Sequence, residues 1–180
     1  MTTSPLSSAI VRPADSADLP HLGRLGALLV QEHHDFDARR FLPARRRTPE
    51  DYAWFLGTQI AEANVVILVA ENDGQVIGYV YGAVEGYDYM SLRGPAAVLH
   101  DLIVDSEYRR RGVGQLLLNA ALSELRSRGA PRVVLSTAER NESAQRLFEW
   151  MGFRRTMVEM TRELDDVPTR GERGPGRADG

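Results

Sequence analysis

The sequence contains no cysteine. This absence excludes disulfide bonds, thiolate metal sites and a cysteine nucleophile, so the chain has no sulfur on which to form an acyl-enzyme. No apolar run is long enough to span a bilayer, and the segment MTTSPLSSAIVRP lacks the basic and apolar regions of a signal peptide. We therefore expect a cytoplasmic protein without a membrane partner.

Charge and composition are typical of an ordinary folded chain. The 180 residues include 25 acidic side chains and 22 lysines and arginines, and 43% are hydrophobic. One domain is expected at this length, and the net charge of −3 argues against a nucleic-acid partner despite the basic run at residues 45–47. Residues 165–180 are rich in proline, glycine and charge, so we predict a domain over residues 1–164 and a disordered C-terminal tail.

Hydrophobic periodicity predicts a mixed α/β (α+β-like) fold. Apolar residues three and four apart predict helices that begin near Asp15, Thr48, Gly114 and Asn141, and the first should end near His33. Short β-branched or apolar runs predict strands at residues 9–12, 65–70, 76–84, 96–104, 132–136 and 156–163. The order β-α-α-β-β-β-α-β-α-β indicates one largely antiparallel sheet with a parallel crossover.

Residues 101–118, DLIVDSEYRRRGVGQLLL, predict a strand, a glycine-containing turn and a helix N-terminus. Backbone N–H groups in such a turn can face an anion, the helix dipole adds positive charge, and arginine donates forked hydrogen bonds to phosphate. The turn is no Walker loop, because no Gly-Lys-Ser/Thr follows, and Leu117 occupies the third glycine position of a dinucleotide fingerprint. A phosphate-bearing ligand is expected. The alternative is a basic surface turn whose glycines serve packing.

Two motifs resemble those of one enzyme family. Arg109-x-x-Gly112-x-Gly114 resembles the pyrophosphate-binding motif of the GNAT superfamily of acetyl-CoA-dependent N-acetyltransferases. The segment NESAQRLFEWMGF, which begins at Asn141, resembles the family's second motif, N-x-x-A-x-x-L-Y-x-x-x-G-F. The likeness covers roughly residues 10–164. It implies the GNAT fold, a central and mostly antiparallel sheet that is splayed at strands 4 and 5 and has helices on both faces.

The resemblance implies that acetyl-CoA binds as the co-substrate, with no metal. The backbone that would pair with its pantetheine arm belongs to Leu102, Ile103 and Val104. The pyrophosphate would rest on the turn, at Arg109, Arg110, Arg111, Gly112, Val113, Gly114 and Gln115. Further cofactor contacts are expected at Asn141, Ser143 and Phe148. Backbone contacts should matter more than any one guanidinium. Arg109 is the motif residue, whereas one or both of Arg110 and Arg111 could simply be solvated.

Acetyl transfer to an amine needs a proton acceptor, because an alkyl amine with a pKa of about 10.4 is protonated at neutral pH. The candidates are His100, Asp101 and Glu85. In polyamine acetyltransferases of the superfamily, which the run LHDLIV resembles, a glutamate matches His100 and an aspartate matches Asp101. A regular pleat would send these neighbours to opposite faces of the strand unless a bulge intervenes. The alternative for His100 is a histidine that is only hydrogen-bonded in a half-buried strand.

One position departs from the family pattern, because Phe148 stands where many relatives have a tyrosine as general acid. Either another group protonates the leaving thiolate, or the thiolate leaves without help, since its pKa is about 8.5. The departure keeps a non-catalytic acyl-CoA-binding module open as the alternative to an N-acetyltransferase. The resemblance also implies that the chain could form a homodimer.

The acceptor is expected to be a primary amine, either a small molecule such as a polyamine or aminoglycoside, or a peptide or protein. An acidic mouth could concentrate such a cation, and its members would be Glu32, Asp35, Asp37, Glu85 and Asp88. A solvated rim is the plainer alternative for these carboxylates. The pair His33 and His34 lies near two of them without a recognised metal-ligand spacing.

Overall fold

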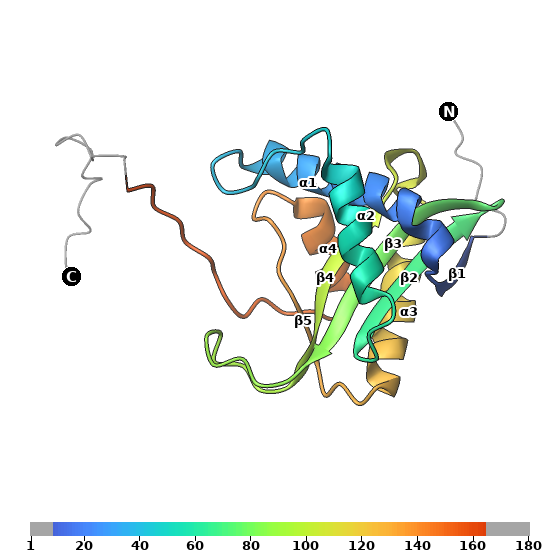
Figure 1. Cartoon of the computed structure of the whole chain (residues 1–180). Helices are drawn as coiled ribbons and strands as arrows, with labels where there is room; N and C mark the ends of the chain where they lie inside the picture. Colours follow the sequence, from blue (N-terminus) through green and yellow to red (C-terminus); the bar gives the residue numbers. More distant parts are fainter. Residues whose placement is uncertain (1–8, 165–180) are drawn as a thin grey trace, which may run out of the picture.

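A five-stranded sheet forms the centre of the computed structural model, which describes residues 9–164 (Figure 1). Its strands, in spatial and chain order, are β1 (Ile10–Pro13), β2 (Val65–Asn72), β3 (Gln75–Glu85), β4 (Ala96–Val104) and β5 (Val133–Leu135). The first four pair antiparallel, and β5 runs parallel to β4. The predicted mixed α/β class is therefore confirmed, while the predicted tail at residues 165–180 lies outside the described range.

Helices cover both faces of the sheet. They are α1 (Leu19–Phe36), α2 (Thr48–Gln59), α3 (Val113–Ser127) and α4 (Glu142–Trp150), with short 3-10 turns η1 (Ser16–Asp18) and η2 (Ser106–Tyr108). One hydrophobic core lies between the sheet and the pair α1 and α2, and a second lies between the sheet, α3 and α4. Successive side chains of a strand point to opposite faces of the sheet, so alternate residues of the central strands contribute to each of the two cores.

Two glycines bring α1 and α2 into close contact. A Cβ on Gly23 would lie 2.2 Å from the carbonyl oxygen of Pro49, and a Cβ on Gly26 would lie 2.2 Å from the ring of Tyr52. Both glycines are buried in α1. The absence of side chains at these positions therefore sets the distance between the two helices and places the Tyr52 ring against α1.

Two predictions about the elements are wrong. The first helix continues to Phe36 instead of ending near His33, because its polar last residues are as compatible with a helical surface as with a loop. The strand predicted at residues 156–163 does not form, and this stretch pairs with no strand among residues 9–164. Its β-branched and apolar residues favour a strand, but a strand also needs a neighbour. No helix in the described part of the chain is long and apolar enough to cross a membrane.

Candidate active site

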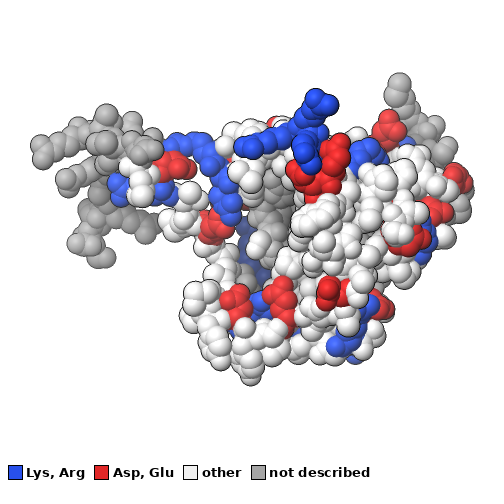
Figure 2. Space-filling model, in the orientation of Figure 1, with Lys and Arg blue, Asp and Glu red and all other residues white. Residues whose placement is uncertain are grey.

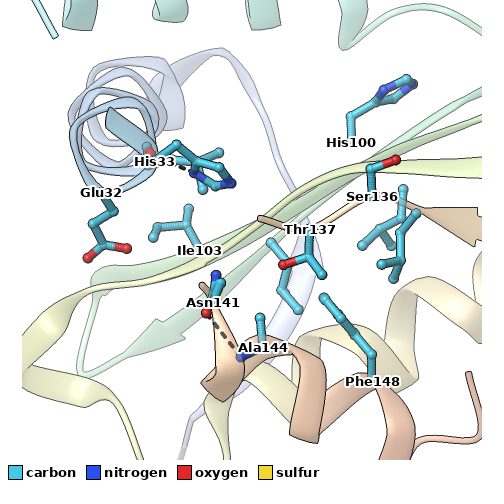
Figure 3. Close-up of a pocket in the computed structure, with 13 residues that line it drawn as sticks. Glu32, His33, His100, Ile103, Ser136, Thr137, Asn141, Ala144 and Phe148 are labelled. Carbon is cyan, nitrogen blue, oxygen red and sulfur yellow. Dashed lines mark hydrogen bonds between the residues drawn. The ribbon is translucent and has the colours of Figure 1, made fainter. Parts of the chain in front are cut away.

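A hollow that is open to solvent lies where β4 and β5 diverge (Figure 3). The strands pair only from Ala97 to Leu99 of β4, so the remainder of β4 has no strand partner on the β5 side. The residues that line the hollow are Leu29, Glu32, His33, Leu99, His100, Leu102, Ile103, Leu135, Ser136, Thr137, Asn141, Ala144 and Phe148. They come from α1, β4, the end of β5 and α4, and they give the hollow an apolar floor and a few polar groups.

A β-bulge lies at His100. Tyr81 of β3 faces Asp101 and the next residue, Gly82, faces Leu99, so His100 has no partner in the register. The His100 ring stacks on Tyr81 with 4.9 Å between centroids, and Asp101 accepts a hydrogen bond from the neighbouring Tyr79 on the same face of the sheet. The bulge therefore places His100 and Asp101 on the α1 and α2 side together, where a regular pleat would have separated them.

His100 and Glu85 contact each other at the edge of the site. His100 Nε2 lies 3.2 Å from Glu85 Oε1, and the other oxygen of Glu85 accepts from Arg93 at 2.8 Å. The His100 ring points away from the other labelled lining residues (Figure 3). Of the three predicted catalytic residues, these two thus lie together, whereas Asp101 is buried.

Asp101 is held by two tyrosines. The hydroxyls of Tyr52 and Tyr79 each donate to its Oδ2 at 2.8 Å. Burial raises the pKa of Asp101, while the two hydroxyl donors and the nearby His100 and His33 favour its charged form. The burial of Tyr52 and Tyr79 beside this carboxylate raises the pKa of both phenols. Asp101 is therefore suited to anchoring the bulge and to stabilising positive charge on either histidine, and it has little room to contact an acceptor.

The raised pKa of Asp101 predicts how its removal changes stability with pH. In Asp101→Asn the side chain no longer titrates, while in the wild type the buried carboxyl group must ionise as the pH rises from about 4, its unfolded value, through the higher folded pKa. The free energy of unfolding of the wild type should therefore fall relative to that of the variant as the pH rises. Denaturant titrations across this range measure the difference, and a wild type that gains on the variant with rising pH would contradict the assignment.

His33 on α1 is a site residue that the sequence reasoning missed. Its Nδ1 lies 2.9 Å from the carbonyl oxygen of Leu29. A carbonyl only accepts, so the proton of neutral His33 is on Nδ1 and Nε2 carries a free lone pair. Phe36 and Phe41 contact the ring edge-on, and the ring reaches toward the hollow (Figure 3). The signal was present in the sequence, because four residues separate His33 from the apolar Leu29 on one helical face.

The arginine and glycine turn precedes α3 as predicted. Arg110 and Gly112 have positive φ values of 61° and 84°, and Gly112 is the N-cap of α3 without a side-chain cap. The first N–H groups of α3 therefore have no capping side chain, which is the arrangement that favours an anion. Gly112 is needed for its backbone conformation, because left-handed φ is strained for any other residue except asparagine or aspartate.

Other residues of the motif have structural partners. Arg109 donates to the carbonyl oxygen of Val104 at 2.9 Å and forms an ion pair with Glu32, so it links α1 to the end of β4. A Cβ on Gly114 would contact Leu147 at 3.4 Å. Gly114 therefore faces α4, which agrees with the alternative that the glycines of this turn serve packing. The rest of the predicted set divides between exposed, core and intermediate positions: Arg110 and Arg111 are exposed, Val113 is in the core and Gln115 is half-buried.

The N-terminus of α4 faces the hollow through Asn141. Its Oδ1 accepts from the N–H of Ala144 at 3.1 Å, and both residues line the hollow. Phe148, one turn further along, is buried, lines the hollow and packs against Phe153 with 5.8 Å between ring centroids. Ser143 is exposed and is not among the lining residues. Two of the three residues predicted on this helix thus belong to the hollow.

Each carboxylate of the predicted acidic mouth has a partner within the described chain. Glu32 pairs with Arg109, Glu85 and Asp88 approach Arg93, and Asp88 also accepts from Ser91, which lowers its pKa. Asp35 accepts from Gln31, and Asp37 accepts from backbone N–H groups of the loop that follows it. Acidic and basic atoms accordingly alternate on the face in Figure 2. These carboxylates therefore form a solvated rim of paired charges, and they do not produce a concentrated negative field. No group of three or more potential metal ligands occurs among residues 9–164.

The chain matches known proteins over the segment that contains the two sequence motifs. Residues 29–153 match the acetyltransferase (GNAT) family. The mycothiol acetyltransferase of Thermobispora bispora is 38% identical over 96 residues, which are 51% of this chain and 31% of that protein. N-acetyltransferase 8 of Homo sapiens is 36% identical over 97 residues, which are 54% of this chain and 42% of that protein. The chain thus spans less than half the length of these two relatives.

The fold agrees with this match. A predicted acetyltransferase from Clostridium acetobutylicum, solved with acetyl-CoA, superposes with a TM-score of 0.67 at 16% identity, and the match covers 90% of this chain and all of that one. At this level of identity, the likeness establishes the architecture. Together with the family match over residues 29–153, it confirms the resemblance drawn from the two sequence motifs: the chain belongs to the acetyltransferase (GNAT) family.

Proposed function

We propose that this protein transfers the acetyl group of acetyl-CoA to a primary amine by direct attack within a ternary complex. The observation that carries the proposal is the hollow between the diverging β4 and β5, with His33 on one side and the α4 N-terminus on the other. A proton acceptor and an unpaired strand edge thus face one space. Direct attack is favoured because the chain has no cysteine to carry an acyl group.

The proposed cofactor path follows the unpaired edge of β4. The pantetheine arm would add to the backbone from Leu102 to Val104, where no β5 residue is paired. The carbonyl of Val104 already accepts from Arg109, so the pairing would centre on Leu102 and Ile103, which line the hollow. The pyrophosphate would accept from the N–H groups of the Gly112 turn and the first turn of α3. Phe148 would contact the thioester end of the cofactor.

We assign the proton acceptor to His33. Its Nε2 would take a proton from the ammonium group of the acceptor, and the free amine would then attack the acetyl carbonyl carbon. The C–N bond forms, the C–S bond breaks, and the sulfur leaves as the thiolate of CoA. Of the two protons that the attacking nitrogen still carries, one passes to solvent and the other remains as the N–H of the neutral amide. Buried Asp101 would stabilise the imidazolium electrostatically, and a backbone N–H of β4 would donate to the oxyanion.

The leaving group requires no acid in this scheme. A thiol with a pKa of about 8.5 is a tolerable leaving group as its thiolate, so Phe148 at the usual tyrosine position is compatible with turnover. The ring instead excludes water from the thioester, since it is buried between α4 and the hollow. For this reason we favour an N-acetyltransferase over a non-catalytic acyl-CoA-binding module.

The proposal is tested by the release of free thiol from acetyl-CoA with a panel of polyamines, aminoglycosides and peptides. Every one of the 22 lysines and arginines is arginine, so no lysine side chain can be acetylated. Thiol release without an added amine therefore measures hydrolysis once it exceeds one equivalent per chain, the most that an α-amino group could account for. Amine-dependent release is expected. Binding of CoA without release for any amine would favour the binding module, and the absence of CoA binding would overturn both.

The turn supplies a matched pair of variants for the same assay. Gly112→Val should weaken acetyl-CoA binding by about tenfold or more, because a β-branched residue is strained at a φ of 84° and the turn must change. Gly114→Ala should leave affinity within about threefold, because its new Cβ meets Leu147 at an ordinary contact distance. Calorimetric titration measures both. Equal affinities for the two variants would remove the Gly112 turn from the binding site.

A further inference from the structure

The loop between β3 and β4 exposes four large apolar side chains. Tyr87, Tyr89, Met90 and Leu92, here named the apolar tip, are 72%, 77%, 91% and 92% exposed. The loop projects beyond the sheet (Figure 1), and the end of this projection is free of charged atoms on the face in Figure 2. Single apolar side chains at a surface are ordinary, whereas several in one place usually mark an interaction site.

Hydrogen bonds within the loop fix the backbone that carries the tip. Asp88 and Arg93 exchange two backbone hydrogen bonds, each 2.8 Å long. The Asp88 carboxylate accepts from the N–H of Met90 at 2.9 Å, and from both the N–H and the hydroxyl of Ser91. The loop is therefore closed across its base and braced by one carboxylate inside it.

The tip is also preorganised at its side chains and at one strained residue. The rings of Tyr87 and Tyr89 stack with 6.2 Å between centroids. Leu92 has a φ of 52°, a left-handed conformation that is strained for leucine. Such strain persists only where the surrounding contacts hold it, and it is concentrated at functional sites. A partner that binds this surface would need to order few additional groups, which favours affinity.

The base of the loop contacts the hollow. Glu85 accepts from Arg93 at 2.8 Å and lies 3.2 Å from Nε2 of His100, which lines the hollow. Asp88, three residues along the chain from Glu85, precedes most of the tip. At ~3.3 Å per extended residue, most of the tip therefore lies on the order of 10 Å beyond the contact at His100. A molecule that occupies the hollow and also contacts the tip has to span this distance.

We propose that the acceptor is an extended peptide that places its amine in the hollow and an apolar side chain on the apolar tip. An extended peptide spans the distance in about three residues, whereas an amine with a single ring is too short. A polyamine or an aminoglycoside carries cations along its length, and the carboxylates at the loop base are already paired with Arg93. The inference rests on the proposed function and selects one class from its acceptors.

Peptides of matched length test the proposal by thiol release. One series has a free α-amino group and no lysine, and a second series is N-acetylated and has one lysine. Within each series, leucine replaces serine at successive positions counted from the amine. In at least one series, leucine at about the fourth residue should raise kcat/KM by about tenfold or more, because burial of one aliphatic side chain has an effect of this size.

Variants of the tip assign this preference to its residues. Tyr89→Ser combined with Met90→Ser should reduce the preference for leucine to less than about threefold. The same double variant should leave kcat/KM for the serine peptide within about twofold, because neither side chain lines the hollow. Trp150→Ser is the matched control, since Trp150 on α4 is 68% exposed and does not line the hollow. It should keep the full preference for leucine.

The contrary outcomes separate this inference from the proposed function. If amines release thiol but leucine and serine peptides react equally, the acceptor does not use the tip and only the inference is wrong. If the double variant changes only the mass in light scattering or the binding to phosphatidylcholine vesicles, the tip contacts a second copy or a bilayer, and the inference is again wrong. If no amine of any class releases thiol, the proposed function fails and the inference fails with it.

Discussion

Replacing His33 by glutamine is expected to lower kcat/KM by about 10²- to 10³-fold, the usual contribution of a general base. Glutamine can keep the hydrogen bond to the Leu29 carbonyl through its amide, so the helix should be unaffected, but it cannot take a proton. The decrease should be largest near neutral pH, where the acceptor amine is protonated. Steady-state thiol release over a range of pH measures it.

Two neighbouring histidines provide the controls. His34 lies next in the chain, contacts the Phe41 carbonyl through Nδ1 and does not line the hollow, so His34→Gln should retain activity within about threefold. His100→Gln should cost less than tenfold if His33 is the base. If His100→Gln causes the larger loss, the proton acceptor is at the bulge, and the assignment to α1 is wrong.

Gly23→Ala is expected to lower the free energy of unfolding by about 3 kcal/mol, near the upper end of the range for an overpacked core position. The new Cβ would lie 2.2 Å from the Pro49 carbonyl oxygen and 2.9 Å from the Cβ of Ala53. Both obstacles belong to α2, and the first is backbone, so no rotamer change relieves the clash. The two helices would have to separate along their glycine contact. Urea denaturation gives the difference directly.

The matched control is Gly57→Ala in α2. Its Cβ would meet Leu19 Cδ1 at 3.2 Å, the flexible end of a side chain. Alanine is also a better helix former than glycine by about 1 kcal/mol. Gly57→Ala should therefore be neutral or slightly stabilising. A similar loss in both variants would show that backbone conformation, rather than the distance between α1 and α2, determines the cost.

The fold could be predicted from the sequence wherever local pattern and tertiary environment agree. The amphipathic stripe after Gly112 and the cap at Asn141 both act within a few residues, and the helices begin where expected. The stretch at residues 156–163 has a strand pattern as well, yet it forms no strand in this chain. The hydrophobic pattern of a segment indicates its propensity to form a strand. Whether the segment pairs depends on a neighbouring strand, which that pattern does not specify.

The site was predictable in outline, and its geometry was not. The motif located the Gly112 turn, because glycine at positive φ is a local requirement. The bulge at His100 depends on the register between β3 and β4, which no single strand encodes. Arg109 matched the motif but binds the Val104 carbonyl and Glu32, partners that are distant or poorly marked in sequence. His33 was missed because the helix was expected to end there.

The contact between Gly26 and Tyr52 has a mechanical consequence. The Tyr52 ring fills the space that a side chain at position 26 would occupy, and its hydroxyl donates to Asp101 beside the bulge. Sliding α2 along α1 would therefore break a partly buried hydrogen bond to β4. These three elements should move as one rigid body. Any widening of the hollow for the proposed acceptor then has to come from the loops that join these elements to their neighbours, at residues 37–47 and 86–95. The conformation of those loops, rather than a helix motion, would limit the size of the amine.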